Sequence, residues 1–334
     1  MEEAIQIVQT IKKGDIKPIY FLMGEEPYYI DKIADFIDEN LLTEEEKGFN
    51  QMVLYGRDTS IEDIVSNARR YPMMAERQVI IIKEAQDLSK SIEKLETYAE
   101  NPQLSTTLVF CYKYKKLDKR KKVYKAVSKT GVLFEGKRLY ENQIPGWIQK
   151  TLKSRDYQIS PKAAQMLVEF LGTDLGKIDN ELQKLQLITP PGSTISPELI
   201  EENIGISKDF NNFELRNAIG ERDDLKAHRI INYFAQNQKD HPMVVTVSLL
   251  YSYFAQILQY HGIADKSKGN VAKVLKVNPF FVKDFVLAAG NYPMKKASVA
   301  IEYLREADVK GKGVGAASVP PGDLLKELLV KIMR

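Results

Sequence analysis

The sequence predicts an α/β domain with a parallel sheet, followed by an all-α region. Two observations lead to this fold class. Short apolar runs alternate with segments of helical spacing as far as about residue 143, and such alternation is typical of a parallel sheet with helices on both faces. Strand signals then stop near Ile144, and helical patterns follow. Because 334 residues suggest two or three domains, we expect domains over residues 1–143, 144–209 and 210–334.

The α/β region is expected to alternate strand and helix throughout. Ile19 to Met23 form an apolar run that Gly24 ends, and Pro27 suits the first turn of the helix that follows. Ser60 is a candidate N-cap, and Asp118 is expected to cap the last helix of the region. Strands are expected over 19–23, 49–55, 76–85, 106–114 and 131–136, with helices over 27–42, 60–71, 89–101 and 118–129.

The remaining chain reads as helices with clear start signals. Ser160, Asp174 and Ser196 are expected N-caps, two of them followed by proline. The next helices are expected over 144–157, 160–172, 174–189, 196–205, 211–221, 223–237, 241–261, 269–277, 278–292, 294–311 and 322–333. Residues 309–322 form a glycine-rich loop to which the sequence assigns no role.

Composition excludes several classes of protein. The content of 44% hydrophobic and 28% charged residues is that of a globular chain, and a net charge of +3 is too small for a general nucleic-acid binder. The single cysteine, Cys111, rules out an internal disulfide and a thiolate zinc site, and fits a reducing compartment. The three histidines lack metal-binding spacing. We therefore expect no metal, no cofactor and no catalytic residue.

A membrane location is not expected. The most apolar stretch, residues 243–258, is interrupted by Thr246, Ser248, Ser252 and Gln256 and is shorter than the roughly 20 apolar residues of a membrane span. The N-terminus lacks the basic region and unbroken apolar run of a signal peptide. We expect a cytoplasmic protein with no membrane partner.

The first strand–turn–helix stands where many α/β proteins carry a phosphate-binding loop. Such a loop needs G-x-x-x-x-G-K-[ST], and here only Gly24 fits. Glu25 and Glu26 stand where a phosphate would bind, and they would repel it. At the end of a later strand, Lys83 replaces the magnesium-binding aspartate and leaves Glu84 alone. The region is therefore interpreted as a degenerate nucleotide site.

Two signals remain. Lysines and arginines with interleaved tyrosines crowd residues 112–125 and include a basic cluster of Lys119, Arg120, Lys121 and Lys122. This patch either contacts nucleic-acid phosphates without reading bases or is a solvated helix face. In the segment after the second expected helix, Pro72, Met73 and Met74 follow Arg70. They either project as an apolar anchor for a partner or pack into the local core.

These stretches together resemble the delta-subunit family of the bacterial DNA polymerase III clamp loader, which is of the AAA+ class. The segments that carry the resemblance are KPIYFLMGEEPYYIDKI, FNQMVLYGRD, ARRYPMMAERQVIIIKEAQDL, LVFCYKYKKLDKRKKVYKA and LVEFLGTDLGKIDNELQKL. The resemblance implies an AAA+-like α/β domain, a small helical lid and a helical collar for oligomerisation. It also implies a non-catalytic subunit that binds and opens the ring-shaped sliding clamp (beta) beside the gamma/tau and delta prime subunits and primer–template DNA.

By position, the resemblance makes Met73 and Met74 the clamp-binding pair, with Pro72 and Arg70 beside them, where the family usually has larger side chains. No ATPase or polymerase site is expected in this chain, although the family belongs to the DNA-directed DNA polymerase (nucleotidyltransferase) holoenzyme. The sensor arginine of the ATPase relatives would fall on Gly176 or Lys177, and their trans-acting arginine near Ser128 to Thr130. The alternatives are an ATP-binding AAA+ protein and a DNA-binding scaffold.

Overall fold

The computed structural model describes residues 2–315 and 318–334. The chain divides into two compact units, Met1–Leu139 and Tyr140–Arg334, which are treated separately here. The three expected domains, over residues 1–143, 144–209 and 210–334, stay predictions.

The first unit contains a five-stranded, fully parallel sheet with the strand order β2-β3-β4-β1-β5. In register, Ile19 of β1 lies opposite Leu108 of β4, and Tyr20 opposite Val132 of β5. The inner strands β1 and β4 are buried almost throughout, because neighbouring strands and helices cover them from both sides. The predicted parallel α/β sheet is confirmed. The strands are β1 (Ile19–Gly24), β2 (Gln51–Tyr55), β3 (Gln78–Lys83), β4 (Thr106–Lys113) and β5 (Val132–Gly136).

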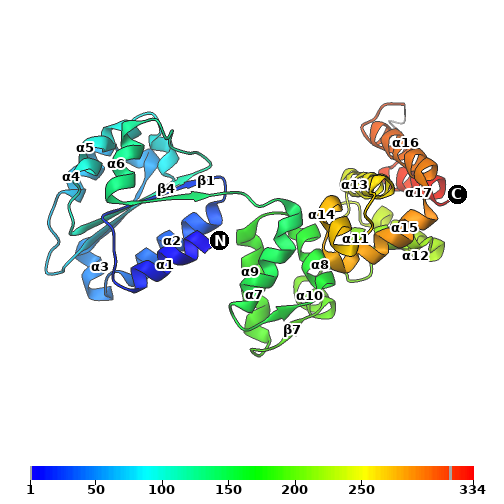
Figure 1. The fold of residues 1–334 in the computed structure, drawn as a ribbon, viewed down its shortest axis with the longest axis horizontal. Coiled ribbons are helices and arrows are strands. Elements are labelled where there is room, and N and C mark those ends of the chain that lie inside the picture. Colours follow the sequence, from blue (N-terminus) through cyan, green and yellow to red (C-terminus); the bar gives the residue numbers. More distant parts are fainter. Residues whose placement is uncertain (1, 316–317) are drawn as a thin grey trace. The chain divides into compact units, whose positions relative to one another are not determined.

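Helices cover both faces of this sheet. Figure 1 shows α1 and α2 on one face and α4, α5 and α6 on the other. Pro27 occupies the first turn of α2, and Ser60 caps α4 by accepting a hydrogen bond from the Asp63 N–H, both as predicted. The helices are α1 (Glu2–Lys12), α2 (Pro27–Asn40), α3 (Glu44–Asn50), α4 (Ile61–Ala68), α5 (Glu96–Glu100) and α6 (Lys122–Thr130), with short 3₁₀ turns at Gly56–Asp58, Ala85–Leu88 and Ile92–Leu95.

Several boundaries in this unit differ from the prediction, and three of these differences have a clear local cause. The second strand starts at Gln51, since Thr43 and Glu46 form a capping box that starts α3 ahead of it. The helix expected over 89–101 starts later, as the 3₁₀ turn at Ile92–Leu95 that continues into α5, and Ser91, whose hydroxyl donates to the Leu88 carbonyl, precedes that turn. The last helix begins at Lys122, because Asp118 accepts hydrogen bonds from Arg120 in a tight turn instead of capping the helix.

The second unit begins with four helices and a small sheet. Ser160, Asp174 and Ser196 cap their helices as predicted. The expectation that strands end near Ile144 is wrong, since β6 (Gln158–Ile159) and β7 (Thr194–Ile195) pair in parallel between these helices. The helices are α7 (Ile144–Lys153), α8 (Pro161–Leu171), α9 (Leu175–Ile188) and α10 (Pro197–Ile204), preceded by a 3₁₀ turn at Glu141–Gln143.

The remaining helices share one apolar core, whose central member is α13. This helix is the one in the described chain that is long and apolar enough to cross a membrane. Its Leu250, Phe254 and Ile257 nevertheless pack in the helical core, as in a soluble protein. The helices are α11 (Asn212–Glu221), α12 (Asp224–Gln236), α13 (Met243–Gly262), α14 (Lys268–Leu275), α15 (Val282–Asn291), α16 (Met294–Gly311) and α17 (Pro321–Met333), with a 3₁₀ turn at Pro279–Phe281.

The glycine-rich loop expected over residues 309–322 is shorter in the structure. Its first residues complete α16, and its last begin α17. Residues 316–317 of this loop lie outside the described residues.

Candidate functional site

Residues 69–77 connect α4 to β3 and form what we call the methionine loop. Met74 is fully exposed, and Met73 is 62% exposed. Met74 also has a positive φ of 54°, a conformation that is unfavourable for a residue with a side chain. Neither methionine packs into the local core, so this alternative is wrong. The loop presents two flexible apolar side chains to solvent.

Side chains from two other elements hold the methionine loop, one at Met73 and one at Arg70. Asn50, the buried last residue of α3, accepts a 2.7 Å hydrogen bond from the Met73 N–H and donates a 2.9 Å bond to the Met73 carbonyl. Gln78, at the start of β3, donates to the carbonyl of exposed Arg70 at 2.6 Å and to the Thr106 hydroxyl at 2.8 Å. Sequence reasoning missed Asn50, because nothing in the local pattern links it to a loop 23 residues later.

A shallow groove lies beside the methionine loop. It is lined by Tyr71, Pro72, Ala75 and Glu76 on one side and by residues 101–105 on the other. The Arg77 guanidinium ties the two sides together by donating to the Leu104 carbonyl at 3.2 Å and to the Thr107 hydroxyl at 3.0 Å. Tyr71 and Leu104 are largely exposed. The exposed apolar surface thus extends beyond the two methionines, while Pro72 is only partly exposed.

In the turn between β1 and α2, backbone N–H groups that could bind a phosphate already donate hydrogen bonds within the chain. Buried Glu26 caps α2 by accepting from the Tyr28 N–H, and its own N–H donates to the Gly136 carbonyl at 3.1 Å. Gly24 has a φ of +124°, and a Cβ there would come within 2.2 Å of the Gly136 oxygen. Exposed Glu25 lies 3.5 Å from the Lys116 ammonium. This arrangement favours a closed acidic turn over an anion-binding loop.

The degenerate magnesium position is also occupied by an ion pair. The Lys113 ammonium lies 2.8 Å from Asp31 and 3.1 Å from Glu84, and so bridges the two carboxylates. Burial acts to raise the pKa of Glu84, but hydrogen bonds from Gln86 and Lys113 outweigh it and lower that pKa. Lys83 ends β3. Glu84 is therefore half-buried and paired, and not the isolated surface residue that the sequence suggested.

The basic cluster lies mostly in the turn before α6, and most of its charges are paired. Arg120 binds Asp118, and its side-chain and backbone hydrogen bonds lower the pKa of Asp118 to about 2. Lys121 pairs with Glu93, and Lys122 lies 3.8 Å from Glu96. Lys119 makes no ion pair with any residue that the structure describes. The charge free for a polyanion is therefore smaller than the sequence implies.

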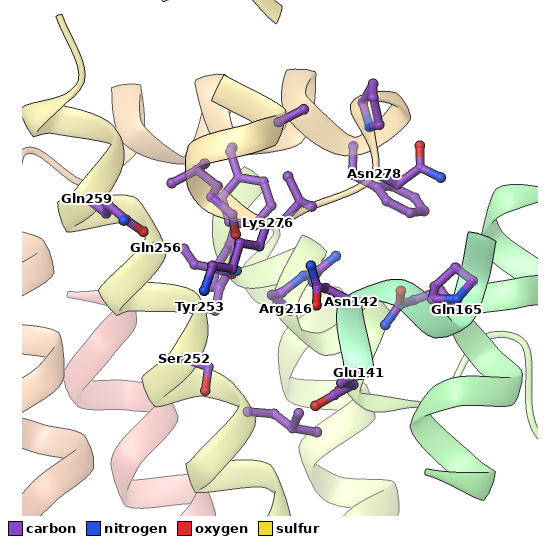
Figure 2. A pocket seen from close by; sticks show the side chains of 18 of the residues that line it. Glu141, Asn142, Gln165, Arg216, Ser252, Tyr253, Gln256, Gln259, Lys276 and Asn278 are labelled. Carbon is purple, nitrogen blue, oxygen red and sulfur yellow. The ribbon is translucent and has the colours of Figure 1, made fainter. Parts of the chain in front are cut away.

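The second unit contains a pocket of about 820 Å³, lined by both polar and apolar side chains, that the sequence did not reveal (Figure 2). Its Arg216 guanidinium lies 4.6 Å from the Phe213 ring and 5.4 Å from the Tyr253 ring. Among the described residues, the buried Nε of Arg216 has no hydrogen-bond partner. Glu169 accepts from the Phe213 N–H at 3.0 Å, and burial raises the pKa of Glu169 to about 7. The pocket thus combines a cationic wall with an acid that titrates near neutrality.

Comparisons with known proteins agree with this architecture. The family model described as DNA polymerase III, delta subunit matches residues 20–137, and the model of that subunit's C-terminal domain matches residues 209–319. The DNA polymerase III subunit delta of Bacillus subtilis (strain 168) is 28% identical over 315 residues, which cover 91% of this chain and 90% of that protein. The solved structure of the Bacillus subtilis DNA clamp loader delta protein (YqeN) aligns with 99% of both chains at 25% identity and a TM-score of 0.55. With its parallel-sheet unit and helical C-terminal region, the chain belongs to the DNA polymerase III delta-subunit family.

Proposed function

We propose that this delta subunit binds the sliding clamp through its methionine loop and opens it for loading onto primed DNA. The observation that carries the proposal is the loop itself, in which fully exposed Met74 follows a backbone held by hydrogen bonds at Arg70 and at Met73. Exposed apolar side chains on a fixed backbone suit a partner pocket, since the side chains gain burial on binding and the backbone loses little further conformational freedom. Pro72 and Arg70 flank the pair and are expected at the rim of the contact.

Simple burial gives a contact of useful strength. Transfer of two methionine side chains into a pocket contributes on the order of 3–6 kcal/mol before the cost of association. Opening a closed ring requires more than tight binding. The loop must bind the opened or strained clamp better than the closed one, because only this difference shifts the equilibrium between the two states.

The proposed role is non-catalytic. Glu26 and Gly136 close the turn that would bind phosphate, and the Lys113 ammonium bridges the carboxylates beside the magnesium position. Both contacts support a subunit that does not hydrolyse ATP itself and works beside gamma/tau and delta prime subunits that do. Assembly through the collar, residues 210–334, the AAA+ character of the first unit and a cytoplasmic location belong to the same proposal.

The test is clamp binding by the purified full-length chain without ATP. Wild type is compared with the double variant Met73→Ala, Met74→Ala by titration calorimetry or surface plasmon resonance. A matched control is Leu187→Ala, Ile188→Ala, since these residues are also an adjacent, exposed apolar pair, 87% and 54% exposed, but lie in the second unit.

The proposal expects a loss of at least tenfold in the methionine variant, about 1.4 kcal/mol, and a change below threefold in the control. An unaffected methionine variant would remove the loop from the contact while leaving clamp binding intact. Failure of the wild type to bind its own organism's clamp would refute the clamp-opening role altogether.

A further inference from the structure

We propose that Asn50 is a positioning residue for clamp binding, which sets the backbone of the methionine loop so that Met74 projects. This inference rests on the proposed function. Asn50 is only 4% exposed and uses its whole amide. Its oxygen accepts from the Met73 N–H, and its nitrogen donates to the carbonyls of Met73 at 2.9 Å and Glu46 at 3.1 Å.

The loop needs such a contact because its conformation is costly by itself. Met74 has a φ of 54°, and its side chain is fully exposed. Packing of that side chain therefore does not stabilise this backbone conformation. Strained backbone of this kind persists only where surrounding groups fix it. Met73 immediately precedes Met74, and the Asn50 side chain bonds both its N–H and its carbonyl, as a neighbouring strand would in a β-sheet. They fix the direction in which the chain enters Met74.

Asn50 itself is held from the other side. It ends α3, a short helix that starts at the capping box of Thr43 and Glu46, and Gln51 then enters β2. The contact therefore links the loop to the sheet through a buried polar side chain. Asparagine is suited to this place, because it offers an acceptor and a donor side by side at the right reach.

Asn50→Asp tests the amide with almost no change of shape. The ionised carboxylate keeps the acceptor for the Met73 N–H but faces the carbonyls of Met73 and Glu46 without a donor. The protonated carboxyl regains one donor, and burial beside two carbonyl oxygens raises the pKa of the introduced group above its ordinary value. The defect in this variant should therefore grow with pH.

Clamp affinity is measured for the full-length chain between pH 5 and pH 8, each variant relative to wild type at the same pH. We expect Asn50→Asp to lose tenfold or more at pH 8 and less than threefold at pH 5. In the Met73→Ala, Met74→Ala background, the same change should cost less than twofold. The matched control is Asn40→Asp, the same change at the exposed last residue of α2, whose amide donates only to the Phe36 carbonyl at 2.9 Å; it should change affinity less than threefold.

A second readout separates this inference from the proposed function. Hydrogen exchange of the Met73 amide reports on its bond to Asn50 without any clamp, with Asn40→Ala at the end of α2 as the control. Faster exchange in Asn50→Ala, together with no effect of the methionine variant on the clamp, would keep the positioning role and reject the clamp contact. Unchanged exchange would overturn the inference, as would a loss in Asn50→Asp that is independent of pH or persists in the methionine-free background.

Discussion

Met74→Gly should weaken clamp binding without weakening the fold. The side chain of Met74 is fully exposed, so its removal costs no packing within the chain. Glycine adopts a φ of 54° without steric cost, which recovers about 1 kcal/mol. The greater freedom of glycine in the unfolded chain offsets about 0.5–1 kcal/mol of this gain. The free energy of unfolding should therefore rise slightly or stay within about 0.5 kcal/mol of wild type.

The effect on binding has the opposite sign and is larger. Burial of one methionine side chain contributes about 1.5–3 kcal/mol, so its loss should reduce clamp affinity roughly 10- to 150-fold. Urea unfolding gives the first quantity, and calorimetric titration with the clamp gives the second. Met74→Leu is the matched control, since it keeps an apolar side chain and the same backbone, and it should bind within about threefold of wild type.

A clear loss of stability in Met74→Gly would refute this reasoning, because it would mean that Met74 packs within the fold. An unchanged affinity would refute it as well, because it would mean that the exposed side chain does not enter the clamp.

Three further predictions concern other parts of the chain. Gly24→Ala should lower the free energy of unfolding in urea by about 3 kcal/mol or more, because the new Cβ would lie 2.2 Å from the Gly136 oxygen. The control Gly14→Ala, whose Cβ would meet no atom within 4 Å, should lower it by about 1 kcal/mol. Equal losses in the two variants would contradict the packing argument. The pKa of Glu169, about 7 against an ordinary 4.5, means that the folded state binds this proton more tightly, so stability should fall as pH rises from about 4.5 to 7. Glu169→Gln should remove this fall in stability and be more stable than wild type by about 1–2 kcal/mol at pH 8, a figure reduced for the partial exposure of the side chain. A difference in melting temperature between variant and wild type that stays the same across this pH range would contradict the prediction. Replacing all four basic-cluster residues by glutamine should lower the salt dependence of DNA binding, measured by fluorescence anisotropy, by about one phosphate contact. The reason is that Lys119 alone makes no ion pair in the described chain. A change equivalent to about three or four phosphate contacts would mean that the other ion pairs open when DNA binds.

The sequence by itself determined the features that depend on neighbours within one helical turn or one strand. Apolar runs such as Ile19 to Met23 predicted the strands, since a buried parallel strand must be apolar on both faces. Ser60, Ser160, Asp174 and Ser196 predicted helix starts, because an N-cap bonds an N–H only two or three residues ahead. The sequence also revealed the absence of a phosphate-binding motif, the two adjacent methionines and the resemblance to the delta-subunit family.

The tertiary structure alone decided which distant groups meet. Asn50 and Met73 are brought together by the packing of α3 beside the loop, and Lys113 reaches Asp31 and Glu84 only because β1, β3 and β4 are neighbours. Local signals can also compete with each other: Asp118 looked like a helix cap, but it bonds Arg120, two residues further on, and the helix begins later. A residue's local preference is worth about 1 kcal/mol, so another contact of similar strength, near or far in the sequence, redirects it. The physical reason is that local signals specify elements, whereas the position of a functional side chain depends on contacts across the sheet that no local spacing encodes.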